Sequence, residues 1–194
     1  MSADESLDAG YFDGIFRGDD DPWNLANSGY EQSKFARTIA TLDDRRYRHA
    51  LEIGCAHGVL TARLAPLCET LLAIDISETA IVKAAKRLAG DRQVAFERMA
   101  FPRETPPSRG FDLIVLSEVV YYWSDADIAL AASWLAGSAA AGGRLILVHW
   151  IGETDYPQTG DEAVAKLWAP LAETFSIDVA DRTRDYRLDL WTRR

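Results

Sequence analysis

Short apolar runs alternate with amphipathic segments along most of the chain. Five of these runs have the length of a buried strand: residues 49–53, 71–76, 93–99, 112–116 and 144–149. The segments between them carry apolar residues at helical spacing. Parallel strands joined by crossover helices produce this pattern. The sequence therefore predicts an α/β fold with a mostly parallel sheet that helices cover on both faces.

Helices are expected over residues 30–42, 59–67, 77–88, 125–140 and 161–172. We expect Gly142 and Gly143 to stop the alanine-rich fourth helix, and Asp161 to cap the fifth. The tail alternates apolar and polar residues in the period of a strand, which predicts a final antiparallel pair. The expected sheet thus has seven strands, mostly parallel, with an antiparallel last strand.

The first stretch of the chain is acidic, yet it is not uniformly polar. Up to about residue 27 it contains large apolar side chains at helical spacing: Tyr11, Phe12, Ile15 and Phe16. A disordered arm seldom carries so many of them. We therefore predict an N-terminal helical cap over residues 1–42 that docks on a body formed by residues 43–194, the two making one structural domain.

Composition narrows the classes of partner. Of 194 residues, 48% are hydrophobic and 26% charged, as in ordinary globular domains. Acidic residues outnumber basic ones by 30 to 21, which gives a net charge of −9. Proteins that bind nucleic acids or anionic membrane surfaces generally need a basic surface. Neither partner is therefore expected.

Other sequence features bear on location and metals. No apolar run is long enough to span a membrane, and the first ten residues lack the features of a secretory signal. The predicted location is therefore cytoplasmic. Cys55 and Cys68 make no disulfide framework and lack zinc-site spacing, and the three histidines do not cluster. No metal site is expected.

A glycine loop follows the first predicted strand, in the segment LEIGCAHG. The dinucleotide fingerprint G-x-G-x-x-G would need glycine where this chain has Glu52 and His57. Glu52 would also oppose a pyrophosphate group, so an NAD-dependent oxidoreductase is disfavoured. Gly54 and Gly58 let the loop approach a ligand closely, and the acid before them suits a cationic one.

Asp75 ends the second predicted strand, about where an acid accepts hydrogen bonds from ribose hydroxyls. Together with Glu52 and Gly54 it indicates a nucleoside that has a positively charged tail. S-adenosylmethionine has a ribose, an ammonium and a sulfonium and no phosphate, so it is the predicted cofactor. In the alternative interpretation, Gly54 makes a simple turn, Asp75 leads a helix and Glu52 is a solvated charge.

From about residue 49 to residue 150, the chain resembles the class I S-adenosylmethionine-dependent methyltransferases. The segments that carry this resemblance are LEIGCAHG, LLAIDIS, FDLIVLSEVVYYW and AAGGRLILVHW. A narrower resemblance, to the nodulation protein S family, is carried by DDPWNLANSGYEQSKF, SEVVYYW and VHWIGETDYPQTGDEA. Members of that family are small N-methyltransferases, and nodulation protein S acts on the free amine of a chitooligosaccharide. The resemblance implies a single-domain Rossmann-like methyltransferase fold.

The predicted cofactor group draws on the strand ends and the cap. Its members are Glu52, Gly54, Cys55, Gly58, Asp75, Ile76, Met99, Ala100, Ser117, Trp23 and Tyr30. Many class I members carry an acid just after the third strand that binds the adenine amino group. Ala100 matches that position here, so this bond must come from the backbone or be missing. Trp23 and Tyr30 are candidates for a lid that excludes water, or for anchors of the cap.

The resembled fold turns the ends of the fourth and fifth strands toward the reacting methyl group. Methyl transfer is a displacement at sulfonium, and the enzyme must hold nucleophile and methyl in line. An amine must shed a proton, and Glu118 and His149 are the candidate catalytic bases. We favour Glu118 because a carboxylate also binds an arriving ammonium.

The predicted contacts to the methyl acceptor are Tyr121, Tyr122, Trp150 and Asp155. The alternatives are that Glu118 leads a short helix, that the aromatic side chains simply pack, and that the backbone satisfies His149. The predicted partner is a small-molecule acceptor, with an amine or amino sugar favoured. Methylation of a hydroxyl compound would give His149 more weight. A third hypothesis is a protein that binds S-adenosylmethionine without turnover.

Overall fold

The computed structural model describes residues 5–194 and divides the chain into two compact units. One unit comprises residues 8–99, and the other comprises residues 5–7 and 100–194. The chain therefore leaves the second unit after Leu7 and re-enters it at Ala100. Residues on both sides of the predicted cap boundary, at 42 and 43, lie in unit 8–99. The predicted division into 1–42 and 43–194 stays a prediction.

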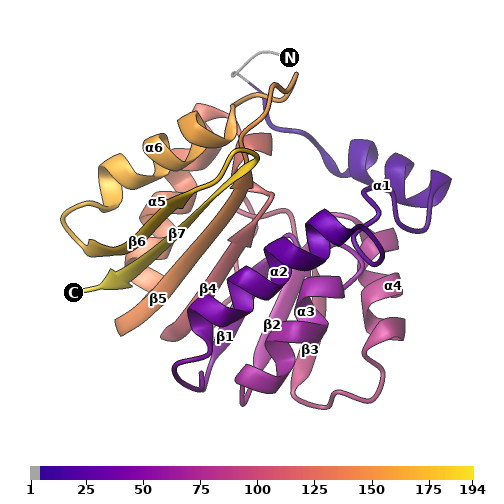
Figure 1. The fold of residues 1–194 in the computed structure, drawn as a ribbon, viewed down its shortest axis with the longest axis horizontal. Helices are drawn as coiled ribbons and strands as arrows, with labels where there is room; N and C mark the ends of the chain where they lie inside the picture. The colour runs from indigo at the N-terminus through magenta and orange to yellow at the C-terminus, as the bar shows by residue number, and fades with distance from the viewer. Residues whose placement is uncertain (1–4) are drawn as a thin grey trace. The chain divides into compact units, whose positions relative to one another are not determined.

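Three parallel strands form the sheet of unit 8–99. The middle strand is β2 (Leu71–Asp75), which pairs with β1 (Ala50–Ile53) and β3 (Val94–Arg98). Every residue of β1 is buried, as expected for a strand covered on both faces. Helix α4 (Glu78–Arg87) packs along β2 and β3 (Figure 1). Both strand–helix–strand predictions for this unit are confirmed.

The helices before and after β1 complete this unit. Helix α1 (Ala9–Gly18) docks on α4 and buries Phe12 and Phe16, so the helix predicted in the acidic stretch is confirmed. Helix α2 (Gly29–Leu42) packs on α3 (Val59–Leu64). A short 3₁₀ turn, η1 (Ala65–Leu67), follows α3 and contains a proline, which cannot continue the helix.

Four strands form the sheet of the other unit. Strand β4 (Phe111–Ser117) runs parallel to β5 (Ala139–Trp150), which pairs antiparallel with β7 (Tyr186–Arg193). Strand β6 (Phe175–Arg182) pairs antiparallel with β7. The predicted antiparallel pair at the end of the chain is confirmed, and the two units together contain seven strands.

Helices cover this sheet, and a short turn links β4 to the first of them. The turn is η2 (Val120–Tyr122), and the helices are α5 (Asp125–Ser138) and α6 (Gly160–Leu171). The two helices pack on each other, and α6 also contacts β5 and β7 (Figure 1). Trp168 of α6 meets Trp191 of β7, with ring centroids 4.9 Å apart. Among residues 5–194, no helix is long and apolar enough to cross a membrane.

The prediction that two glycines stop the alanine-rich helix was wrong. Helix α5 ends at Ser138 and β5 begins at the next residue, so Gly142 and Gly143 lie inside the strand. The register between β4 and β5 shifts between Phe111 and Leu113. The extra residues of β5 are thus absorbed as an irregularity at its start.

The predicted cap of α6 was also wrong. Thr159 caps the helix, because its hydroxyl accepts from the Glu162 N–H at 3.2 Å while the Glu162 carboxylate accepts from the Thr159 N–H at 3.0 Å. This reciprocal capping box satisfies two backbone donors. Asp161 lies within the first turn and pairs with Arg182 and Arg187.

Candidate active site

The glycine loop joins β1 to α3. Gly54 and Gly58 have φ values of 80° and 82°, which favour glycine. A Cβ on Gly58 would lie only 3.1 Å from the Cβ of Ala84 in α4. Gly58 therefore also allows α3 to begin close against α4. The Gly54 N–H donates to the Ile74 carbonyl at 2.8 Å, which ties the loop to β2.

Asp75 stands at the end of β2 beside this loop. One carboxylate oxygen accepts from the Ala56 N–H at 2.8 Å, and the other accepts from the Ser77 N–H at 2.9 Å. Burial raises the pKa of Asp75 to about 6. Each carboxylate oxygen accepts more than one hydrogen bond. Asp75 thus keeps acceptor capacity for the hydroxyl groups of a ligand.

Glu52 lies inside β1 and is 2% exposed. Burial raises its pKa to about 8. Its Oε2 atom has no hydrogen-bond partner among residues 5–194. A buried acid lacking a donor is costly, and an ammonium group would both donate to it and favour its charged form. The residues present therefore fit a ligand with an ammonium and ribose hydroxyls, as the predicted cofactor has.

The remaining cofactor candidates of this unit have varied surroundings. Cys55 is buried, and burial raises the pKa of its thiol, which keeps it neutral. The Met99 N–H donates to the Asp75 carbonyl at 2.8 Å, and the Ile76 carbonyl accepts from Arg98. Ile76 and Met99 therefore flank Asp75 at the ends of β2 and β3. Their contact with a ligand stays a prediction.

Helix α1 is fastened to the start of α4, the helix that follows Asp75. Asp13 accepts from the Ser77 hydroxyl at 2.5 Å and from the Thr79 N–H at 3.2 Å. The Lys83 ammonium donates to the Phe16 carbonyl at 2.6 Å and to the Asp19 carbonyl at 3.1 Å. We call these four contacts the α1 clasp.

The two aromatic lid candidates have different settings. Trp23 packs edge-on to Phe16 with centroids 5.3 Å apart, and Phe16 in turn meets the ring of His57 in the glycine loop. Tyr30 is 38% exposed at the start of α2 and has the Lys34 ammonium 4.9 Å from its ring centroid. Trp23 thus reaches the glycine loop through one intermediate ring. A lid function for either residue stays a prediction.

In the second unit, Glu118 links the ends of β4 and β5. Its Oε2 accepts from the Tyr121 hydroxyl at 2.6 Å and from the Trp150 N–H at 2.9 Å. Its φ of 57° lies in the left-handed region, which costs energy for a side chain of this kind. The preceding Ser117 is the half-buried last residue of β4. Strained residues of this sort concentrate at functional sites.

His149 is fully buried at the end of β5. Its Nε2 accepts from the Val120 N–H at 3.2 Å, so that nitrogen carries no proton and its lone pair is engaged. A general base needs an accessible lone pair facing the proton it removes. This arrangement matches the alternative in which the backbone satisfies His149. A role of His149 as the base stays a prediction.

Three tyrosines pack together beside Glu118. Tyr121 meets Tyr122 edge-on at 4.6 Å and stacks on Tyr156 at 5.4 Å, and Tyr122 meets Tyr156 at 4.7 Å. Burial raises the pKa of Tyr121 and of Tyr122, so both phenols stay protonated. Sequence reasoning missed Tyr156, although it lies beside Asp155 in a loop predicted to contact the acceptor. Asp155 itself is exposed.

Gln158 anchors the loop that carries Tyr156. Its backbone N–H donates to the Tyr121 carbonyl at 3.2 Å, and its side-chain amide donates to Asp125 at 2.7 Å. Lys166 of α6 donates to the side-chain carbonyl of Gln158 at 2.7 Å. The amide is thus held from both sides, which fixes the end of the loop against η2.

The carboxylate of Glu104 lies beside the backbone of Ala100. The Ala100 N–H donates to Glu104 Oε2 at 2.7 Å, and the Glu104 N–H donates back to the Ala100 carbonyl at 2.9 Å. Sequence reasoning looked for an acid at position 100 and missed this one four residues later. Glu104 could have been found only by predicting the turn that brings it back to Ala100.

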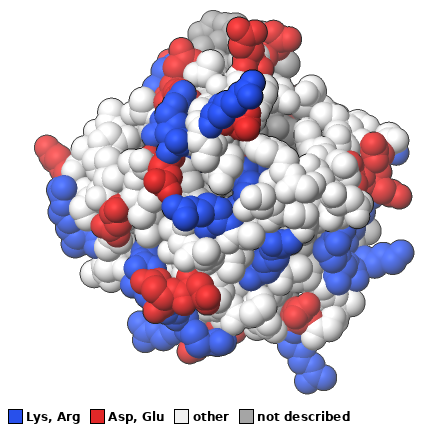
Figure 2. All heavy atoms as spheres, in the orientation of Figure 1, with Lys and Arg blue, Asp and Glu red and all other residues white. Residues whose placement is uncertain are grey.

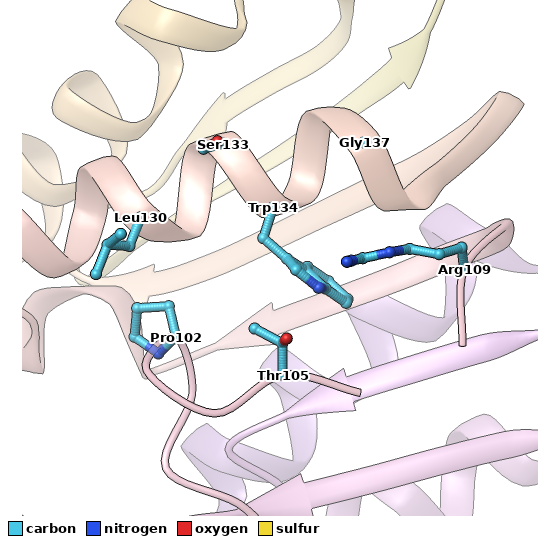
Figure 3. Close-up of a pocket in the computed structure, with 7 residues that line it drawn as sticks. All are labelled: Pro102, Thr105, Arg109, Leu130, Ser133, Trp134 and Gly137. Atoms are coloured by element: carbon cyan, nitrogen blue, oxygen red, sulfur yellow. The ribbon is translucent and has the colours of Figure 1, made fainter. Parts of the chain in front are cut away.

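A cavity of about 400 Å³ lies between α5 and the loop of residues 102–109. Its lining residues are Pro102, Thr105, Arg109, Leu130, Ser133, Trp134 and Gly137 (Figure 3). The Arg109 guanidinium lies 5.2 Å from the ring centroid of Trp134. None of the predicted cofactor-binding, catalytic or acceptor-binding residues lines this cavity.

Charge and metal ligation add little to the candidate site. On the face drawn in Figure 2, basic and acidic side chains are interspersed and form no continuous basic surface. Within the part of the chain that the structure describes, no group of three or more His, Cys, Asp or Glu side chains is arranged to hold a metal ion.

Comparison with known families decides the relationship of the chain. The model of the Nodulation protein S (NodS) family matches residues 17–143, which is well over half of the sequence. The chain belongs to the NodS family. Nodulation protein S of Bradyrhizobium diazoefficiens is 37% identical over 107 residues, covering 55% of this chain and 51% of that protein. The protein of Sinorhizobium fredii is 33% identical over 129 residues, covering 66% of this chain and 59% of that protein. This NodS family member thus spans about half to three fifths of the length of the curated relatives it matches.

Solved structures confirm the predicted fold class of this NodS family member. The N-methyltransferase NodS of Bradyrhizobium japonicum, in complex with S-adenosyl-L-homocysteine, superposes with a TM-score of 0.82 at 24% identity, covering 96% of this chain and 99% of that one. A methyltransferase from Pseudomonas syringae, described as putative, superposes with a TM-score of 0.72 at 33% identity, covering 86% and 100%. The seven-stranded Rossmann-like methyltransferase fold and the NodS resemblance are both confirmed.

Proposed function

We propose that this NodS family member is an S-adenosylmethionine-dependent methyltransferase that methylates the nitrogen of a small amine. The observation that carries the proposal is the buried carboxyl group of Glu52, whose Oε2 has no hydrogen-bond partner among residues 5–194. The ammonium of the cofactor supplies that partner. The B. japonicum NodS structure is that of an N-methyltransferase, which supports the same conclusion.

The residues that hold the cofactor come from the ends of three strands. When bound, S-adenosylmethionine supplies an electrophilic methyl group on a sulfonium. Glu52 binds the ammonium, and Asp75 accepts from the ribose hydroxyls. The adenine packs against the side chains of Ile76 and Met99, because the Met99 and Ala100 N–H groups already donate to Asp75 and Glu104. Glu52 binds the substrate form of the cofactor and its product alike, so its main effect is on affinity rather than on the chemical step.

Glu118 is the group that receives the proton of the acceptor. An amine attacks through its lone pair and gains a bond to the methyl carbon while the sulfur takes back its electron pair. The new ammonium then gives up one proton, which a carboxylate accepts. The hydrogen bonds from Tyr121 and from the Trp150 backbone orient this carboxylate in advance.

The acceptor that we propose is an amino sugar or the free amine of a chitooligosaccharide, as the resemblance to the nodulation protein S family implies. The engaged Nε2 of His149 argues against an O-methyltransferase, because a hydroxyl nucleophile needs a stronger base than a carboxylate. The exposed acids after β5, Glu153 and Asp155, suit a cationic or hydroxyl-rich acceptor.

Transfer of a labelled methyl group from S-adenosylmethionine tests the proposal. The acceptors are glucosamine, short chitosan oligosaccharides and simple amines. Glu118→Gln should lower kcat by about 10²-fold or more and leave the affinity for S-adenosylhomocysteine unchanged by calorimetry. Glu97→Gln, an exposed acid on β3, is the control and should keep near-normal kcat. Tight binding of NAD without binding of S-adenosylmethionine would contradict the proposal, and cofactor binding without transfer to any amine would favour a non-catalytic binding protein.

A further inference from the structure

The backbone of Trp150 has close neighbours at its N–H and at its carbonyl, yet the residue is partly open to solvent. Its N–H donates to Glu118 at 2.9 Å, and it lies opposite Tyr186 in the β5–β7 ladder. Its carbonyl lies so close to Gly160 that a Cβ there would overlap it. The residue is nevertheless 36% exposed. An exposed aromatic side chain on a fixed backbone, next to a candidate catalytic carboxylate, is suited to binding a ligand.

The indole of Trp150 packs directly against the backbone of Gly152. A Cβ on Gly152 would lie 2.6 Å from the Cε2 and Cη2 atoms of Trp150, and nearer still to Cζ2. Real Cβ atoms do not approach other atoms that closely. Gly152 is not among the glycines with positive φ. A side chain at position 152 would therefore meet the indole of Trp150, which would have to move.

We propose that Trp150, seated on Gly152, is a stacking platform for the ring of the methyl acceptor, and that Gly152 thereby sets specificity for amines carried on a saturated ring such as a pyranose. The inference rests on the proposed function, since it concerns the same acceptor. The link to the chemistry is direct: the residue that presents the indole also donates its backbone N–H to the carboxylate of Glu118.

The chemistry around the platform favours a sugar ring. The face of an indole is electron-rich and attracts the weakly positive C–H groups of a pyranose. The loop that follows, residues 151–159, contains two carboxylates and no lysine or arginine. Those carboxylates, Glu153 and Asp155, are exposed and accept hydrogen bonds from hydroxyl and ammonium donors. An anionic ring would be repelled here.

The variant Gly152→Ala tests the platform because the added methyl group must displace the indole. It should raise KM for a glucosamine tetramer about tenfold. It should leave KM for the open-chain amine 2-aminoethanol and the affinity for S-adenosylhomocysteine unchanged. Gly137→Ala on α5 is the matched control, because a Cβ at that position meets nothing within 4 Å. Equal effects of Gly152→Ala on the two acceptors, or no effect on either, would overturn the inference.

A second measurement needs no turnover. The glucosamine tetramer should change the indole fluorescence of the wild-type protein, and the change should be lost in Trp150→Ala and reduced in Gly152→Ala. The same sugar-induced change in Trp150→Ala would overturn the inference. Sugar binding through Trp150 without methyl transfer would overturn the proposed function while leaving the platform intact, so the two failures are distinguishable.

Discussion

Glu52 and Asp75 are acids in surroundings that disfavour their charged forms. Burial raises their pKa values to about 8 and about 6, from ordinary values of 4.5 and 3.8. As pH rises from about 4 toward 8, the unfolded chain releases these two protons before the folded protein does. The contribution of both residues to folding stability is therefore greatest at low pH and is lost as pH rises through the folded pKa values. A cationic ligand reverses this effect by stabilising the charged carboxylates.

Cofactor affinity should therefore depend on pH through Glu52. Between about pH 6 and pH 8, the affinity for S-adenosylhomocysteine should rise by up to about tenfold per pH unit, because binding releases the Glu52 proton. Calorimetry across that range in buffers of different ionisation enthalpy measures both the affinity and the released proton. Glu52→Gln should flatten the profile, whereas the exposed Glu97→Gln should retain it. A pH profile that is unchanged in Glu52→Gln would remove Glu52 from ammonium binding.

Gly58 is a loop position at which a side chain would be strained. Gly58→Ala should lower the free energy of unfolding by about 2 kcal/mol, from the positive φ and the contact with Ala84 together. Denaturant unfolding measures the loss. Gly90→Ala, where a Cβ meets nothing within 4 Å, should change stability by less than about 0.5 kcal/mol. Equal stability of the two variants would show that α4 yields to the added methyl group.

At the scale of elements, the α1 clasp holds the helix of the acidic N-terminal stretch against α4. The hydrogen bond from the Ser77 hydroxyl, above all, holds the pKa of Asp13 below its usual value. Lys83 binds the last carbonyls of α1, which would otherwise lack partners, and its positive charge suits the negative end of the helix. The helix is therefore held at both its middle and its end by α4.

Removing Lys83 should loosen α1 without unfolding the unit. In Lys83→Met, amide hydrogen exchange over residues 9–19 should accelerate about tenfold, because two helix-end carbonyls lose a donor. Exchange in β1 and β2 should stay at the wild-type rate. Lys86→Met, an exposed lysine one turn along the same helix, should exchange like the wild type. Acceleration in both variants alike would mean that net charge, and not the clasp, holds α1.

The alternation of strands and helices could be predicted because period and length are local properties of the sequence. The end of α5 could not be predicted. Alanine favours helix, but pairing of Ala139 with Phe111 of β4 takes precedence there. The cap of α6 was predictable in principle. Thr159 and Glu162 have the spacing of a capping box, whereas Asp161 offers a cap without the reciprocal partner.

The site was predicted where residues follow directly on strands and missed where loops fold back. Glu52, Asp75 and Glu118 are placed by β1, β2 and β4, so their positions follow from the strand pattern. Glu104 and Tyr156 are placed by turns whose path no periodicity reveals. His149 has the sequence position of a base, but only the structure shows that a backbone N–H occupies its Nε2.

At the scale of the whole molecule, the net charge of −9 has several origins. Glu52 and Asp75 belong to the proposed cofactor site, and Asp13 to the α1 clasp. Asp161 and Asp189 are neutralised by arginines around β7. Much of what composition alone suggests to be a solubilising charge therefore has a specific structural partner.

Ligand binding should be visible as thermal stabilisation. At about one hundred times its Kd, S-adenosylhomocysteine adds about 2.7 kcal/mol, which raises Tm by roughly 5–10 °C for a chain of this size. Thermal shift assays measure this directly. Asp75→Asn should lose most of the shift at the same concentration, and NAD should produce none. An undiminished shift in Asp75→Asn would contradict the ribose assignment.

The chain passes between its two units twice, after residue 7 and again after residue 99. The unit of residues 8–99 is thus an insertion within the other, whose first segment is anchored by the bond of Ser6 to Asp127 and of the Leu7 N–H to the Tyr122 carbonyl. A single proteolytic nick at either crossing leaves the other crossing as a covalent tether. To express the unit of residues 5–7 and 100–194 by itself, a new linker would have to join residues 7 and 100. A truncation that starts at residue 100 would remove Ser6 and Leu7 from that unit.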